Sequence, residues 1–136
     1  MSHIQPAFDG TEMVASAPAK IRRIVDDYEA WVTEVWDAFV EAADTREPFT
    51  VAEIAAAKNL PDPPHPKSQW GSLPGRLQDA GIIRHHDYGG SVRAHQSLVH
   101  VWIGVPAPLR EMVAARRREE RAARRAARAL ERRAAA

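Results

Sequence analysis

Residues 49–83, FTVAEIAAAKNLPDPPHPKSQWGSLPGRLQDAGII, decide the fold class that the sequence predicts. Thr50 and Glu53 have the Thr-x-x-Glu spacing of a capping box, in which the two residues satisfy backbone N–H groups at the start of a helix. They predict a short helix over 51–57. Residues 59–66 contain four prolines and cannot continue that helix, because proline lacks an N–H donor and fixes φ.

A second helix is predicted over 66–80. Pro66 suits the first helical position, with His65 beside it at the cap, and Gly81 suits the C-terminal cap. Apolar side chains recur at spacings of three and four residues, which places them on one inward face. They are Trp70, Leu73, Leu77 and Ala80. Pro74 lies inside this pattern and predicts either a kink or a later start of the helix.

Two strands follow the second helix. Residues 82–88 are predicted to form the first strand, and residues 98–103, rich in Val, Ile and Trp, its antiparallel partner. The glycine-containing segment 89–91 connects them. A short helix, a turn, a second helix and a two-stranded hairpin together predict a winged helix-turn-helix, a mainly α chain of the α+β class.

Two further helices flank this unit. Residues 19–44 have apolar positions at alternating spacings of four and three, which predict a long amphipathic helix. Those positions are Ile21, Val25, Tyr28, Val32, Val35 and Phe39. From Leu109 onward the chain is almost entirely Arg, Ala and Glu, which are strong helix formers with little to bury. We therefore expect a flexible tail over 1–18, a winged-helix domain over 19–105 and a basic helical tail over 106–136.

The composition is that of a folded chain without special chemistry. Its 136 residues include 45% apolar and 27% charged residues and no Cys, which excludes disulfides, thiolate metal sites and a Cys nucleophile. The sequence has neither an apolar run of ~20 residues nor the order of a secretory signal. We therefore expect a cytoplasmic protein that does not enter a membrane.

Charge is distributed unevenly along the chain. Residues 1–47 hold four basic and ten acidic side chains, a net charge of −6. Residues 48–105 hold five basic and four acidic side chains, and residues 106–136 hold ten Arg and four Glu, a net charge of +6. The overall charge of +1 therefore combines an acidic front with a basic tail, and a basic tail is typical of chains that bind polyanions.

Residues 48–104 also carry a recognisable motif. It consists of Phe49-Thr-Val-Ala-Glu-Ile, Pro64-His-Pro, Trp70-Gly71, Gly81-Ile82-Ile83, Tyr88, Ser91, Arg93, His95 and Val101-Trp102. The motif resembles small winged-helix proteins encoded by bacteriophages and prophages, often beside replication or recombination genes. The resemblance implies a winged-helix fold and a DNA context rather than a mechanism. Pro74-Gly75 departs from the regular recognition helix of that type.

Candidate DNA contacts fall in three places. The polar positions of the 66–80 helix would enter the major groove: Lys67, Ser68, Gln69, Ser72 and Arg76. The wing residues would touch the backbone or the minor groove, with Arg93 foremost: Ser91, Arg93 and His95. The tail arginines are expected to surround their helix and neutralise phosphates: Arg116, Arg117, Arg118, Arg121, Arg124, Arg125, Arg128, Arg132 and Arg133. Ordinary solvated surfaces would carry the same residue types.

The sequence predicts neither an enzyme nor a cofactor. It lacks a glycine-rich phosphate loop, a nucleophile elbow and an acidic metal cluster. His85 and His86 are adjacent on a strand and face opposite sides, so they predict no metal site.

Several partners are compatible with these residues. A DNA-binding chain would act as a transcriptional regulator or as a replication or recombination accessory, and the long helix 19–44 would allow homodimerisation. In one alternative the chain is a protein-interaction adaptor that uses Trp31, Trp36 and the basic tail. In another it binds RNA through the arginine-rich tail.

Overall fold

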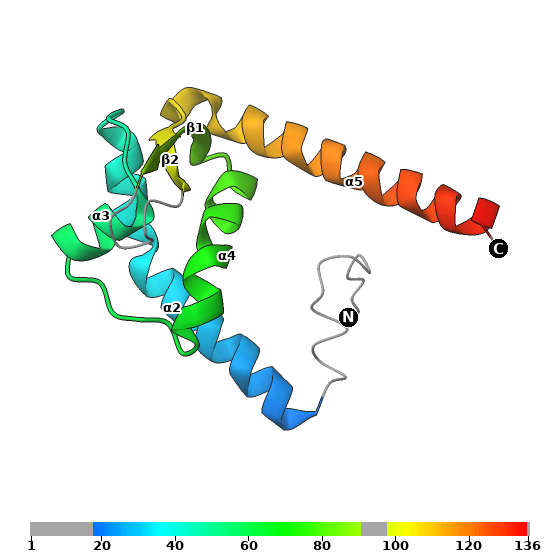
Figure 1. The fold of residues 1–136 in the computed structure, drawn as a ribbon, viewed down its shortest axis with the longest axis horizontal. Coiled ribbons are helices and arrows are strands. Elements are labelled where there is room, and N and C mark those ends of the chain that lie inside the picture. Colours follow the sequence, from blue (N-terminus) through cyan, green and yellow to red (C-terminus); the bar gives the residue numbers. More distant parts are fainter. Residues whose placement is uncertain (1–17, 91–97, 136) are drawn as a thin grey trace.

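The computed structural model describes residues 18–90 and 98–135, and it is mainly helical with one small antiparallel sheet (Figure 1). This confirms the α+β class. The elements in chain order are α2 (Ala19–Asp44), α3 (Val51–Ala57), α4 (Pro66–Asp79), β1 (Ile83–Gly90), β2 (Leu98–Gly104), the short 3-10 helix η1 (Ala107–Leu109) and α5 (Arg110–Ala135). The long first helix has the bounds that its apolar spacing predicted.

The hydrophobic core lies between α2, α4 and the sheet. Val35 and Phe39 of α2 and Leu73 and Leu77 of α4 are fully buried, and Ile83 of β1 joins them. The apolar spacings of the two helices therefore point into one common core, as helical periodicity requires. From Trp31 onward the apolar face of α2 is buried in this core, whereas Ile21, nearer its start, is 49% exposed.

The sheet consists of β1 and β2, paired antiparallel from Ile83 opposite Gly104 to Gly90 opposite Leu98. The register shifts between His85 and Asp87, which marks a β-bulge. A separate β-bridge joins Phe49 to Trp102. The Phe49 N–H donates to the Trp102 carbonyl at 2.9 Å, and the Trp102 N–H donates back at 2.8 Å. The segment before α3 is thereby tied to the hairpin.

The helix ends follow their local signals with one correction. Thr50 Oγ1 accepts the Glu53 N–H at 3.1 Å, which confirms the Thr50 half of the predicted capping box. His65 is the N-cap residue of α4, but its side chain makes no capping bond, and instead its N–H donates to Gln69 Oε1 at 2.8 Å. Pro74 does not delay the start of α4, which begins at Pro66 and continues through Pro74 to Asp79.

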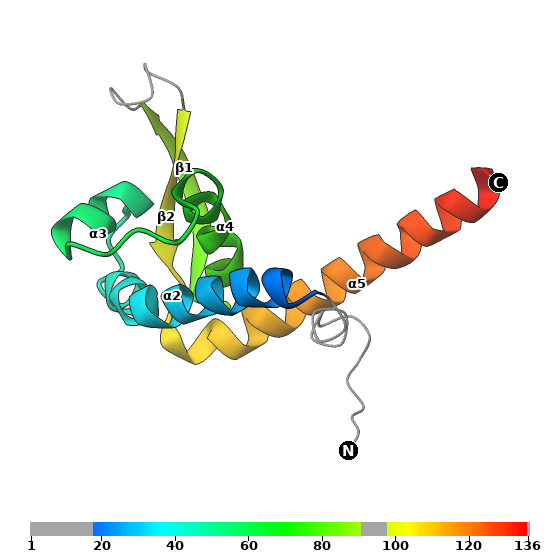
Figure 2. The same ribbon diagram turned by 90° about the horizontal axis from the view of Figure 1, so that it is seen from below.

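The last helix leaves the rest of the molecule. Figures 1 and 2 show α5 beginning beside the sheet and extending well beyond the other elements. Ala114 is its only buried residue within the described part of the chain. Gly81 permits close packing at the root of α5, since it has a φ of +74° and an added Cβ would lie 2.1 Å from the Arg110 carbonyl oxygen.

Candidate nucleic-acid interface

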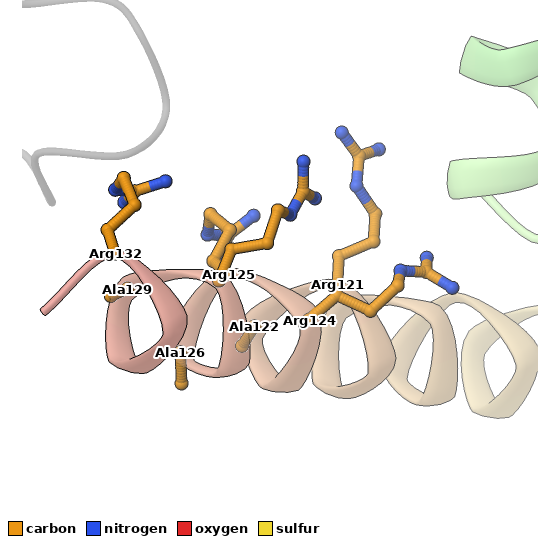
Figure 3. Close-up of a pocket in the computed structure, with 8 residues that line it drawn as sticks. Arg121, Ala122, Arg124, Arg125, Ala126, Ala129 and Arg132 are labelled. Atoms are coloured by element: carbon orange, nitrogen blue, oxygen red, sulfur yellow. The ribbon is translucent and has the colours of Figure 1, made fainter. Parts of the chain in front are cut away.

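The arginines of α5 lie mostly on one side of the helix. Successive residues of an α-helix are about 100° apart, so a set at spacings of three and four falls within an arc of about 100°. This set, the basic stripe, is Arg117, Arg121, Arg124, Arg125, Arg128 and Arg132. Figure 3 shows its labelled members rising from one side of α5, around a shallow hollow, while Ala126 points the other way.

The one-sided stripe corrects the expectation that the tail arginines surround the helix. Only Arg116 and Arg133 lie well outside it, each about 80° beyond an edge, and Arg118 borders it. The signal was present in the sequence as the recurring three- and four-residue spacing. A one-sided array is suited to following one polyanionic surface, because every side chain can reach the same partner.

The inner end of the basic stripe is fixed to α4. Arg117 donates from Nε and Nη2 to Asp79 Oδ1, at 3.2 and 3.0 Å, and Arg121 forms an ion pair with Asp79 Oδ2. Arg110, at the root of α5, donates to the Val105 carbonyl at 2.9 Å. Because Asp79 ends α4, these contacts set the direction of α5 relative to α4. The outer arginines then extend beyond the body on the same side of α5.

Two of the α4 residues expected to contact DNA instead join α4 to α2. Ser72 Oγ shares a hydrogen bond of 2.7 Å with the Tyr28 hydroxyl. Arg76 donates two hydrogen bonds to the Glu29 carboxylate, at 2.6 and 2.8 Å, and lies over the Tyr28 ring. The hydrogen bond from Arg76 lowers the pKa of Glu29, and the same bond raises the pKa of Arg76. Both predicted DNA contacts thus serve helix packing in this structure.

The other three predicted residues lie in the first turn of α4. Lys67 and Ser68 are exposed, whereas Gln69 is half-buried and caps the helix through its side-chain oxygen. The remaining predicted contacts, in the wing, are Ser91, Arg93 and His95, which lie outside the described residues.

The open face of α4 is mostly bare backbone. The helical repeat places Gly71, Pro74 and Gly75 between Lys67 and Gln78 on one side. A Cβ added at either glycine would meet nothing within 4 Å, so packing inside the chain does not require glycine there. Sequence reasoning missed Gln78, because the inward positions of this helix were identified and its open face was not traced.

That bare face borders a groove of about 870 Å³ between α3, α4 and β2. The α3–α4 groove is lined by Val51, Ala52, Ala55, Ala56, Leu60, Asp62, Trp70, Gly71, Pro74, Gly75, Gln78, Val99, His100 and Trp102. Its lining is mainly apolar, and Trp70 Nε1 donates to Asp62 Oδ1 at 3.1 Å along its edge. Such a groove is shaped for an apolar segment rather than for phosphates.

An aromatic cluster covers the face of the sheet next to the groove. The ring of His85 lies 4.5 Å from that of Tyr88 and 5.1 Å from that of His100, measured between centroids, and His100 stacks on Trp102. His100 therefore lies on a face of the sheet. Within the described residues, His85 Nε2 is a buried side-chain atom without a hydrogen-bond partner.

One of the two tryptophans that the sequence offered for an adaptor is buried. Trp31 is 4% exposed, contacts the Trp70 ring edge-on and donates its indole N–H to the Pro61 carbonyl at 2.8 Å. Trp36 is half-buried against the core. Trp31 is thus closed to a partner, because it is buried and its indole N–H already bonds to Pro61.

Across residues 18–90 and 98–135, no three His, Asp or Glu side chains come together as a metal site would require. Over the same residues, every helix is too short or too polar to cross a membrane. Comparison with known proteins found no matching family model, no similar curated protein and no similar solved structure.

Proposed function

We propose that this chain is a winged-helix protein that binds double-stranded DNA through the basic stripe of α5. The observation that carries the proposal is the one-sided row of arginines on a helix that projects from the body. From Arg117 to Arg132 the stripe is about 22 Å long at 1.5 Å per residue. Duplex DNA carries one negative charge per ~1.7 Å of its axis, so the stripe can neutralise several phosphates at once.

The order of elements supports the winged-helix part of the proposal. A long helix, two shorter helices and a hairpin follow one another, and the Phe49–Trp102 bridge adds a third extended segment beside the hairpin. In that fold α4 would be the recognition helix. Its open face offers only Lys67 and Gln78 beside bare backbone, which favours phosphate contacts over sequence-specific base readout.

The experiment measures binding of the full chain to a fluorescent duplex by anisotropy over a series of salt concentrations. We expect the logarithm of the affinity to fall linearly with the logarithm of salt. Arg124→Ala/Arg128→Ala should reduce the slope by up to about 2, at about 0.9 per lost phosphate contact. The control Arg116→Ala/Arg133→Ala removes the same charge outside the stripe and should change the slope less.

Three results would count against the proposal. Absence of duplex binding by the full chain at low salt would refute it. Equal effects of the two double variants would show that charge, and not its position on α5, governs binding. Tighter binding to an RNA hairpin than to the duplex would make RNA the ligand.

The same assay separates the two roles that a DNA-binding chain could have. Equal affinity for unrelated duplexes would support an accessory role in replication or recombination, whereas selectivity for one duplex sequence would support a transcriptional regulator.

The apolar α3–α4 groove supports a second candidate function, which is the docking of another protein. Its lining is mainly apolar, and Gly71 and Gly75 leave the backbone of α4 open to close approach. This function would become the leading one if the full chain failed to bind duplex DNA at low salt.

A further inference from the structure

Helix α2 carries acidic side chains on the side that faces away from the core. This set, the acidic stripe, is Asp26, Asp27, Glu34, Asp37 and Glu41, and all of its members are exposed. The helical repeat places them within an arc of about 100°, roughly opposite the buried Phe39. This exposed side of α2 is therefore charged, whereas Val32, Val35 and Phe39 are buried in the core.

We propose that the acidic stripe of one copy of this chain docks on the basic stripe of a second copy, and that this contact competes with nucleic acid for α5. The stripes have opposite charge and similar length, since each runs over 15 residue steps, or about 22 Å. Within one chain Glu41 pairs with Lys58, and Arg117 and Arg121 pair with Asp79, so docking at these ends has to compete with those ion pairs.

The stripes of one chain face different neighbours, so their contact requires two chains. Arg117 and Arg121 face Asp79 of α4. Tyr28, which contacts Ser72 of α4, lies on the far side of α2 from the acidic stripe, and Glu29, which pairs with Arg76, lies about 110° from the middle of that stripe. A twofold arrangement allows each α5 to lie along the α2 of the other copy, which makes two equivalent contacts.

Each ion pair across this contact stabilises the dimer only slightly, and salt weakens the whole contact. Exposed pairs contribute well under about 1 kcal/mol each, so only a row of them holds two chains together. The net charge of +1 leaves almost no overall repulsion between copies. Docking itself does not depend on the proposed DNA function, whereas the competition rests on it.

The test measures the mass of the full chain by sedimentation at about 50 mM and about 500 mM salt, where screening differs strongly. We expect a doubled mass at low salt and a monomer at high salt. Glu34→Lys/Asp37→Lys and Arg124→Glu/Arg128→Glu should each be monomeric at low salt. An equimolar mixture of these two variants should regain the doubled mass, because each altered stripe then faces an oppositely charged one.

The matched control is Arg116→Glu/Arg133→Glu, which changes the charge equally outside the basic stripe. It should dimerise alone and should not restore the mass of Glu34→Lys/Asp37→Lys. A monomeric unaltered chain at low salt, a dimer that survives high salt, or equal restoration by the control would each overturn the docking.

Duplex binding separates this proposal from the proposed function. Glu34→Lys/Asp37→Lys leaves α5 intact but adds positive charge, which by itself tightens binding to DNA. Its gain in duplex affinity over the unaltered chain should therefore be larger at concentrations where the unaltered chain dimerises than at concentrations where it is monomeric. An equal gain at both concentrations would overturn the competition. If the mixture restores the dimer while the unaltered chain does not bind DNA, the docking stands and the DNA function fails.

Discussion

Replacing Gly104 with Ala should destabilise this protein strongly, because β2 and the end of α2 meet there backbone to backbone. An added Cβ would lie 2.0 Å from the Ala43 carbonyl oxygen and 2.6 Å from its Cα. Contacts of a Cβ essentially never fall below 3.0 Å, so strand and helix must separate by about 1 Å. No side-chain rotation relieves a clash with backbone, and Ala43 is fully buried. We expect a loss of about 3–5 kcal/mol, above ordinary overpacking.

The measurement is urea unfolding followed by tryptophan fluorescence, with Gly75→Ala as the matched control. A Cβ at Gly75 meets nothing within 4 Å, and alanine is the better helix former. The same substitution should therefore stabilise the chain by up to about 1 kcal/mol there. A Gly104→Ala variant within about 0.5 kcal/mol of the unaltered chain would refute the placement of β2 against α2. A destabilising Gly75→Ala would show that something covers the open face of α4.

Two further predictions concern the ion pairs of α4. Asp79→Asn removes the ion pairs of Arg117 and Arg121 and so releases both side chains for phosphates. The slope of log affinity against log salt for duplex binding should then steepen by up to about 2. An unchanged slope in the anisotropy measurement would contradict this. Arg76 holds the pKa of Glu29 below its ordinary value of 4.5, so the pair stabilises the fold above that pH and loses its effect as the pH falls through the lowered pKa. Glu29→Gln should cost under about 1 kcal/mol in urea unfolding at pH 7, because the pair is half exposed, and the difference should shrink below pH 4.5.

The candidate interface was only partly readable from the sequence. The arginine spacing of α5 is a local property, and tracing it residue by residue gives the basic stripe without a structure. The role of Arg76 is different, since its partner Glu29 lies 47 residues away on another helix. Polarity shows that an arginine needs solvent or a partner, but helix packing decides which one it receives.

By itself the sequence determined the order of the elements, the bounds of α2, the Thr50 cap and the side of each helix that enters the core. These follow from the 3.6-residue period and from hydrogen bonds within one turn, so they depend on neighbours along the chain. The tertiary structure alone decided that Trp31 is closed off, that Arg117 and Arg121 share Asp79 and that α4 presents bare backbone to a groove. Those features depend on how helices distant in sequence approach one another, and local periodicity does not encode that approach.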